Sequence, residues 1–111
     1  MPTQRDVRRI ALSLPETTEQ DHHGMSSFRV RGKIFATVPD NRHVRIMADE
    51  EEIRAAVAGD PESCDGFYWG KRLACVVVDV RLANLERLRE LLLDAWLRKA
   101  PKSIARQILN S

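Results

Sequence analysis

Residues 26–36 read SSFRVRGKIFA, and this stretch is the most informative part of the chain. Strand-forming residues lie on both sides of Gly32, so the sequence predicts two antiparallel strands, over 27–31 and 33–38, joined by a tight turn. Three cations and two phenylalanines lie in this one hairpin. We therefore expect an antiparallel sheet at the centre of the fold, with positive charge on one of its hairpins.

The form of the turn decides where Phe35 lies. Strand alternation places Arg29 and Arg31 on one face of the sheet in either case. If residues 31–33 form the loop, Phe35 joins these arginines on the outer face, where an aromatic ring between cations can stack on bases. If a two-residue turn begins at Gly32, Phe35 joins the core instead. The residues alone leave both arrangements open.

Four amphipathic segments predict helices. Thr3, Asp49 and Asn84 stand where the N-caps of the first three are expected, two of these helices end before a proline, and residues 103–109 form the short last one. The apolar face of the longest helix carries Leu85, Leu88, Leu92, Ala95 and Trp96. Trp96 is therefore predicted to lie in the core.

The segments between these helices complete the predicted topology. Residues 16–24 are rich in acids and indicate a loop, whereas 43–47, 67–69 and 73–80 indicate strands. The predicted order is α-β-β-β-α-β-β-α-α. It indicates an α+β fold of two layers, in which helices pack on one face of an antiparallel sheet of about five strands. We expect residues 1–111 to form one domain.

The composition is that of an ordinary globular protein, with 43% hydrophobic and 31% charged residues. The first residues lack the apolar run of a signal peptide, and no apolar stretch approaches the ~18 residues that span a bilayer. We therefore expect a cytoplasmic protein with no membrane partner, a monomer or weak dimer, in which Cys64 and Cys75 stay unpaired.

The positive charges gather in the hairpin region and near the C-terminus. The net charge of +2 is too small to indicate a nucleic-acid-binding protein by itself, but this distribution allows one basic face. A solvated sheet face is the other interpretation of the same residues. The candidates for contacting phosphates are Arg29, Arg31, Lys33, Arg45, Lys71 and Arg72. The candidates for stacking on bases are Phe35 and Trp69.

His22 and His23 form the cluster closest to a catalytic or metal-binding motif. Adjacent histidines in a loop lack the spacing that orients metal ligands, and the sequence contains no nucleophile elbow and no Gly-rich phosphate loop. We therefore predict no metal, no cofactor and no enzymatic activity. A small enzyme using His22 or His23 is an alternative that requires a concave pocket joining this loop to a carboxylate.

Four blocks of sequence occur in a recognisable order: LSLPET at 12–17, SFRVRGKIFA at 27–36, YWGKR at 68–72 and LLDAWLRKAPK at 92–102. They are spread over the chain from residue 12 to residue 102, and their succession resembles the MmcQ/YjbR family of small bacterial proteins. The resemblance implies an α+β fold similar to that of secretion chaperones, with helices on an antiparallel sheet. It also implies a DNA-binding role, and it supplies no catalytic residues.

The leading hypothesis is a non-enzymatic module that binds nucleic acid, with DNA the expected partner, on a basic sheet and hairpin face. The first alternative is a protein-interaction module that binds a segment of another protein on the same face. Exposed apolar area beside the arginines would favour the protein partner, whereas a continuous positive surface would favour nucleic acid.

Overall fold

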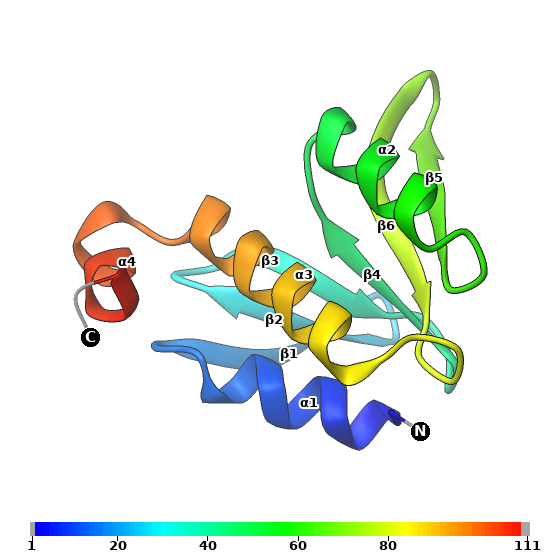
Figure 1. Cartoon of the computed structure of the whole chain (residues 1–111). Coiled ribbons are helices and arrows are strands. Elements are labelled where there is room, and N and C mark those ends of the chain that lie inside the picture. The colour runs from blue at the N-terminus through cyan, green and yellow to red at the C-terminus, as the bar shows by residue number, and fades with distance from the viewer. Residues whose placement is uncertain (1, 110–111) are drawn as a thin grey trace.

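The computed structural model describes residues 2–109. Within this range the predicted α+β class is confirmed, because an antiparallel sheet carries helices on one face (Figure 1). The elements are α1 (Gln4–Ser13), β1 (Thr17–His22), β2 (Met25–Val30), β3 (Lys33–Val38), β4 (His43–Met47), α2 (Glu50–Gly59), β5 (Cys64–Trp69), β6 (Arg72–Asp79), α3 (Leu85–Lys99) and α4 (Lys102–Leu109). None of the helices in residues 2–109 is long and apolar enough to cross a membrane.

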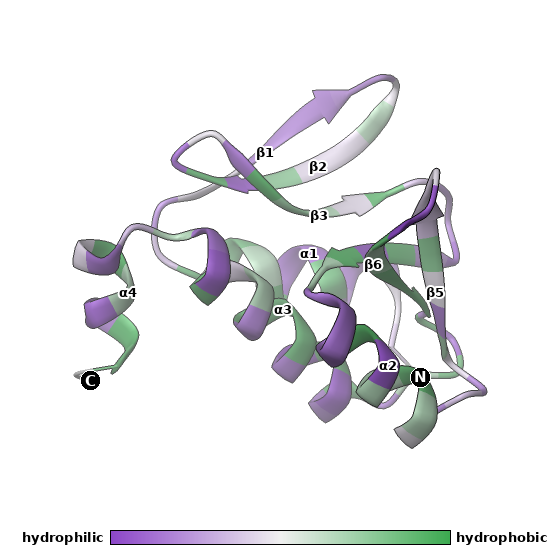
Figure 2. Cartoon of the chain, turned by 90° about the horizontal axis from the view of Figure 1, so that it is seen from above, coloured by the Kyte–Doolittle hydropathy of each residue, from purple (hydrophilic) through white to green (hydrophobic). Residues whose placement is uncertain are grey.

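The described residues form a sheet of six strands in the order β1-β2-β3-β4-β6-β5. Every neighbouring pair is antiparallel. The sheet twists strongly, so that β1 to β3 run in a clearly different direction from β4, β6 and β5 (Figure 1). Seen from above, α1, α2 and α3 lie together on one side of the sheet, and the other side carries no helix of the described chain (Figure 2).

The prediction of a loop over residues 16–24 was wrong, because Thr17–His22 forms strand β1. This strand pairs with β2 along its whole length, so the described sheet has six strands rather than about five. Four consecutive residues of β1, from Thr18 to Asp21, are exposed, and a strand at the edge of a sheet tolerates such charged and polar side chains. Thr17–His22 is a strand because its backbone pairs with β2. Its sequence shows no apolar alternation from which a strand could be predicted.

The turn between β2 and β3 differs from both predicted alternatives. Arg31 and Gly32 form it, with positive φ angles of 50° and 79°. A bulge follows, in which Phe28 opposes Ala36 while the next residue of β2 opposes Ile34, so that Phe35 is the extra residue of β3. Phe35 is fully buried, as in the alternative that placed it in the core.

The core lies between the sheet and the helices. On α3, four of the five predicted core residues are buried: Leu88, Leu92, Ala95 and Trp96. Leu85, predicted on the same stripe, is 36% exposed because it is the first residue of the helix and projects beyond the packed layer. The indole N–H of Trp96 donates to the carbonyl of Pro15 at 3.0 Å, which ties α3 to the end of α1.

The predicted helix caps are confirmed. Asp49 accepts a hydrogen bond from the backbone N–H of Glu52 at 2.8 Å, and Asn84 accepts one from that of Arg87 at 2.7 Å. Thr3 forms a capping box with the third helical residue of α1. The acidic first turn of α2 therefore has a structural role, because carboxylates are stabilised at a helix N-terminus.

Candidate functional site

A groove of about 440 Å³ lies on the helix-free face of the sheet. Its apolar lining consists of Met25, Ile34, Met47, Phe67, Trp69 and Cys75. Its polar lining consists of His22, His23, Thr37, Arg45 and Lys99. None of these eleven described residues is an aspartate or a glutamate, so the lining carries positive charge without an opposing carboxylate. We call this feature the central groove.

Strand register explains why these residues meet. Cross-strand partners in an antiparallel sheet share a face, so paired residues can line one groove together. The pairs that line the central groove are His22 with Met25, Thr37 with Arg45, Met47 with Cys75, and Phe67 with Cys75. The groove is thus assembled from all six strands and the last residue of α3.

Arg45 projects from β4 into the central groove. Its guanidinium carbon lies 4.4 Å from the centroid of the Phe67 ring, a cation–π contact that holds the cation without an acidic partner. Cys75 also lines the central groove and is 2% exposed. Burial raises the pKa of the Cys75 thiol to about 11, although the nearby Arg45 opposes the shift. The thiol is therefore neutral at physiological pH and places no negative charge beside Arg45.

Trp69 stands at one end of the central groove and is 60% exposed. It is the last residue of β5, pairs with Arg72 of β6, and precedes a turn in which Gly70 has a φ of 62°. Lys71 and Arg72 are both exposed at this turn. The structure therefore brings one predicted stacking residue and two predicted phosphate-contacting residues to the same end of the β5–β6 hairpin.

The remaining predicted cations lie around the β2–β3 hairpin. Arg29 projects from β2, half-buried, and its Nε donates to the Ser27 hydroxyl at 3.0 Å. Lys33 is exposed at the start of β3. Arg31 lies in the turn, so strand alternation does not apply to it, and its Nε pairs with Glu16 at 2.8 Å. This hydrogen bond raises the pKa of Arg31, and the pair with Glu16 is exposed to solvent.

Phe35 is excluded as a stacking residue, which corrects the prediction that it could contact bases. Its ring is 0% exposed on the helix-covered side of the sheet. The physical reason is the β-bulge, which lets both Phe35 and its neighbour Ala36 point into the core. The aromatic residue that sequence reasoning missed is Phe67, whose position becomes meaningful only when β4 places Arg45 over it.

His22 and His23 lie at the tip of the β1–β2 hairpin, and their rings meet edge to face with centroids 4.5 Å apart. Both line the central groove, beside Arg45 and Lys99 rather than a carboxylate. The pocket that a histidine-based enzyme would require is therefore not formed here by the described residues. Within residues 2–109, no three His, Cys, Asp or Glu side chains are placed to hold a metal ion.

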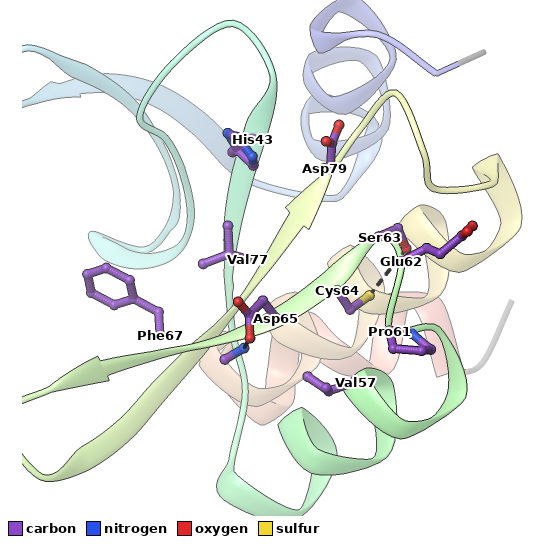
Figure 3. Close-up of a pocket in the computed structure, with 11 residues that line it drawn as sticks. His43, Val57, Pro61, Glu62, Ser63, Cys64, Asp65, Phe67, Val77 and Asp79 are labelled. Carbon is purple, nitrogen blue, oxygen red and sulfur yellow. Dashed lines mark hydrogen bonds between the residues drawn. The ribbon is translucent and has the colours of Figure 1, made fainter.

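A second pocket, of about 510 Å³, lies around the outer part of β5 and has the opposite charge (Figure 3). His43, Val77 and Phe67 lie on one side of β5 there, with Val57 and Pro61 on the other. Its lining includes the carboxylates of Glu62, Asp65 and Asp79. Phe67 lines both pockets, so it marks the border between the cationic central groove and this acidic pocket, which extends around the sheet edge at β5.

Asp79 of the acidic pocket, and Asp40 beside His43, contact neighbouring side chains. Asp79 accepts a hydrogen bond from the Nε of Arg42, and Asp40 contacts Nδ1 of His43 at 3.0 Å. Burial by itself raises the pKa of Asp79, but the hydrogen bonds from Arg42 and from the backbone of Arg81 outweigh it and hold the pKa below its usual value. The pKa of Asp40 is lowered mainly by the backbone N–H of Arg42.

Comparison with known proteins adds the family and an independent view of the fold. The family model for YjbR matches residues 12–98. The crystal structure of the Deinococcus radiodurans protein DR2400, which carries a domain of the family DUF419, superposes with a TM-score of 0.77. The superposition covers 97% of this chain and 88% of that chain at 20% identity, so it supports the fold alone. No match was found among the curated proteins.

Proposed function

The chain belongs to the YjbR family, and we propose that it is a non-enzymatic module that binds nucleic acid, DNA in particular, on the helix-free face of its sheet. The observation that carries this proposal is the lining of the central groove. Arg45 and Lys99 face it together with the exposed ring of Trp69, and its described lining contains no carboxylate. Cations that neutralise phosphates and aromatic rings that accept bases are the two parts of such a site.

The surroundings of the groove support the same partner. Lys71 and Arg72 extend the positive charge beyond Trp69, and Arg29 adds to it from β2. The acidic pocket lies at the other side of Phe67, where its carboxylates would repel a phosphate backbone. The footprint proposed here is therefore short, and it lies on the side of Trp69.

The test is salt-dependent binding of a fluorescent DNA at about 50 mM and about 200 mM salt. Arg45→Gln combined with Lys99→Gln removes two cations from the groove. Each lost phosphate contact makes the slope of log K against log salt shallower by ~0.7 to 0.9, so the double variant should lose about twice that amount.

A matched control removes the same charge elsewhere. Arg5→Gln combined with Arg89→Gln changes two exposed arginines on α1 and α3, so both double variants fall from a net charge of +2 by the same amount. The control should keep the parent's affinity and salt slope. Absence of binding by the parent at low salt, or equal losses in the two double variants, would refute the proposed function.

A protein partner is the second candidate, because Met25, Ile34 and Met47 are half-buried apolar side chains beside Arg45. Apolar area next to arginines is the feature that favours a protein segment. The discriminating probe is a fluorescent peptide with a short run of leucines flanked by glutamates, so that leucines can enter the groove while the flanking carboxylates reach its cations. Binding of this peptide without binding of DNA would replace the first candidate by the second.

A further inference from the structure

We propose that the central groove holds an unpaired base stacked on Trp69, so that the nucleic acid it selects is single-stranded. This inference rests on the proposed function and names the class of nucleic acid that the same site takes. It is carried by the shape of the groove, by the position of the one open aromatic ring in its described lining, and by the absence of a helix on this side of the described sheet.

The size and concavity of the groove fit one nucleotide rather than a duplex. Its volume of about 440 Å³ lies in the range of ~300–1,000 Å³ that encloses ligands of drug size. In a duplex, the faces of each base are covered by its neighbours, and only the base edges are reachable through the grooves. A base can therefore enter a hollow surface only when it is unpaired or flipped out of the stack.

Trp69 is the ring that can receive the base. It is 60% exposed, whereas the neighbouring ring of Phe67 already has the guanidinium of Arg45 over its face at 4.4 Å. Arg45 is thereby fixed beside the place where the base would lie, and a planar guanidinium can itself stack on a base. The phosphates on either side of that base would meet Lys71, Arg72 and Lys99.

The arrangement of the helices argues against reading a duplex on this face. Proteins that read duplex DNA commonly insert a helix into the major groove. In the described chain, α1, α2 and α3 pack on the opposite face of the sheet and their apolar sides are buried against it (Figure 2). The central groove is thus a sheet surface with an aromatic platform, which is the arrangement that binds single strands.

The decisive experiment compares two neighbouring aromatic residues of β5. Trp69→Ala removes the stacking ring, and Tyr68→Ala is the matched control, because Tyr68 is 54% exposed but lines a different pocket with Ile53 and Arg54 of α2. The probes are a fluorescent thymidine single strand of about ten nucleotides and a duplex of the same length. Trp69→Ala should weaken single-strand binding about 5- to 150-fold, the equivalent of ~1–3 kcal/mol of stacking per base.

Four further results are expected from the same probes. Tyr68→Ala should bind the single strand like the parent. The parent should bind the duplex more weakly than the single strand, and Trp69→Ala should leave the weak duplex binding unchanged. Trp69→Phe should recover most of the affinity, because a smaller aromatic ring still stacks.

Tryptophan emission gives a second readout that loss of folding would not imitate. The chain has two tryptophans, and Trp96 is 0% exposed, so a change in emission on adding the single strand reports on Trp69. The single strand should quench emission of the parent and leave emission of Trp69→Phe unchanged.

The outcomes separate this inference from the proposed function. Duplex binding as tight as single-strand binding, or equal losses from Trp69→Ala and Tyr68→Ala, would overturn the inference. The proposed function would survive if Arg45→Gln with Lys99→Gln still reduced the salt slope. Absence of binding to both probes by the parent would overturn both.

Discussion

Trp96 and Trp69 lie on opposite sides of the sheet, and they differ in how much of the ring is buried. Trp96 is 0% exposed between α3 and the sheet, and its N–H bonds to the carbonyl of Pro15. Trp69 is 60% exposed at the end of β5, beside a groove with two cations. Burial of the Trp96 ring contributes its full transfer free energy to folding, whereas the exposed ring of Trp69 contributes little. An exposed indole in such a groove is therefore better explained by a ligand than by folding.

The same contrast holds for the two faces as wholes. The helix-covered face buries Phe28, Phe35 and Ile46 to 1% exposure or less. The helix-free face leaves its methionines half-buried and holds Arg45 against Phe67 without an acidic partner among the described residues.

Trp96→Ala should cost ~3–5 kcal/mol of unfolding free energy, because it opens a large cavity and leaves the carbonyl of Pro15 without its indole donor. This is a large part of the ~5–15 kcal/mol that stabilises a typical domain. Urea denaturation followed by circular dichroism measures the loss. An unchanged midpoint would mean that the stability of the packing between the helices and the sheet does not depend on the Trp96 ring.

Gly32→Ala should cost ~1–2 kcal/mol, because alanine must adopt the left-handed conformation at a φ of 79°. A Cβ there would meet no atom within 4 Å, so the cost is conformational rather than steric. The matched control is Gly59→Ala, since Gly59 ends α2 without a positive φ and has room for a methyl group. Equal thermal midpoints for the two variants would show that the positive φ at Gly32 adds no conformational cost for alanine.

Asp79→Asn should flatten the loss of stability in acid. The pKa of Asp79 is lowered in the folded state, so its contribution is present above the ordinary carboxyl pKa near 4 and is lost as the pH falls through the lower folded value. Near neutral pH the variant should lose ~0.2–1 kcal/mol through its weakened pair with Arg42. Denaturation midpoints measured across this acidic range provide the check. Parallel pH profiles for the parent and the variant would contradict it.

Trp69→Ala should change the unfolding free energy by less than about 0.5 kcal/mol, because the ring is already largely in water. Tyr68→Ala should behave in the same way. Differential scanning calorimetry of both variants tests the point. A large loss for Trp69→Ala alone would assign its ring to the stability of the hairpin and weaken the case for a ligand.

Much of the helical layer could be predicted from local sequence. The caps Asp49 and Asn84, the helix stop at Pro101 and the burial of Trp96 each depend on a few neighbouring residues and on helical periodicity. Strand β1 could not be predicted, because residues 17–22 carry no apolar alternation and become a strand only by pairing with β2.

The site was predictable only in part. Arg45, Trp69, Lys71 and Arg72 were identified from charge and strand propensity, and the fold brings Arg45 and Trp69 into one groove and the other two beside it. The bulge in β3 places Phe35 in the core, and the turn places Arg31 beside Glu16. Neither position follows from simple strand alternation.

The α+β class, the order of most elements and the helical residues that enter the core follow from local sequence, because they depend on interactions a few residues apart. Long-range folding is needed to bring Met25, Arg45, Trp69 and Lys99 into one groove and to gather the carboxylates on the other side of Phe67. These residues lie on different elements, and their meeting depends on strand order and register. Those are set by long-range pairing, which a local pattern does not encode.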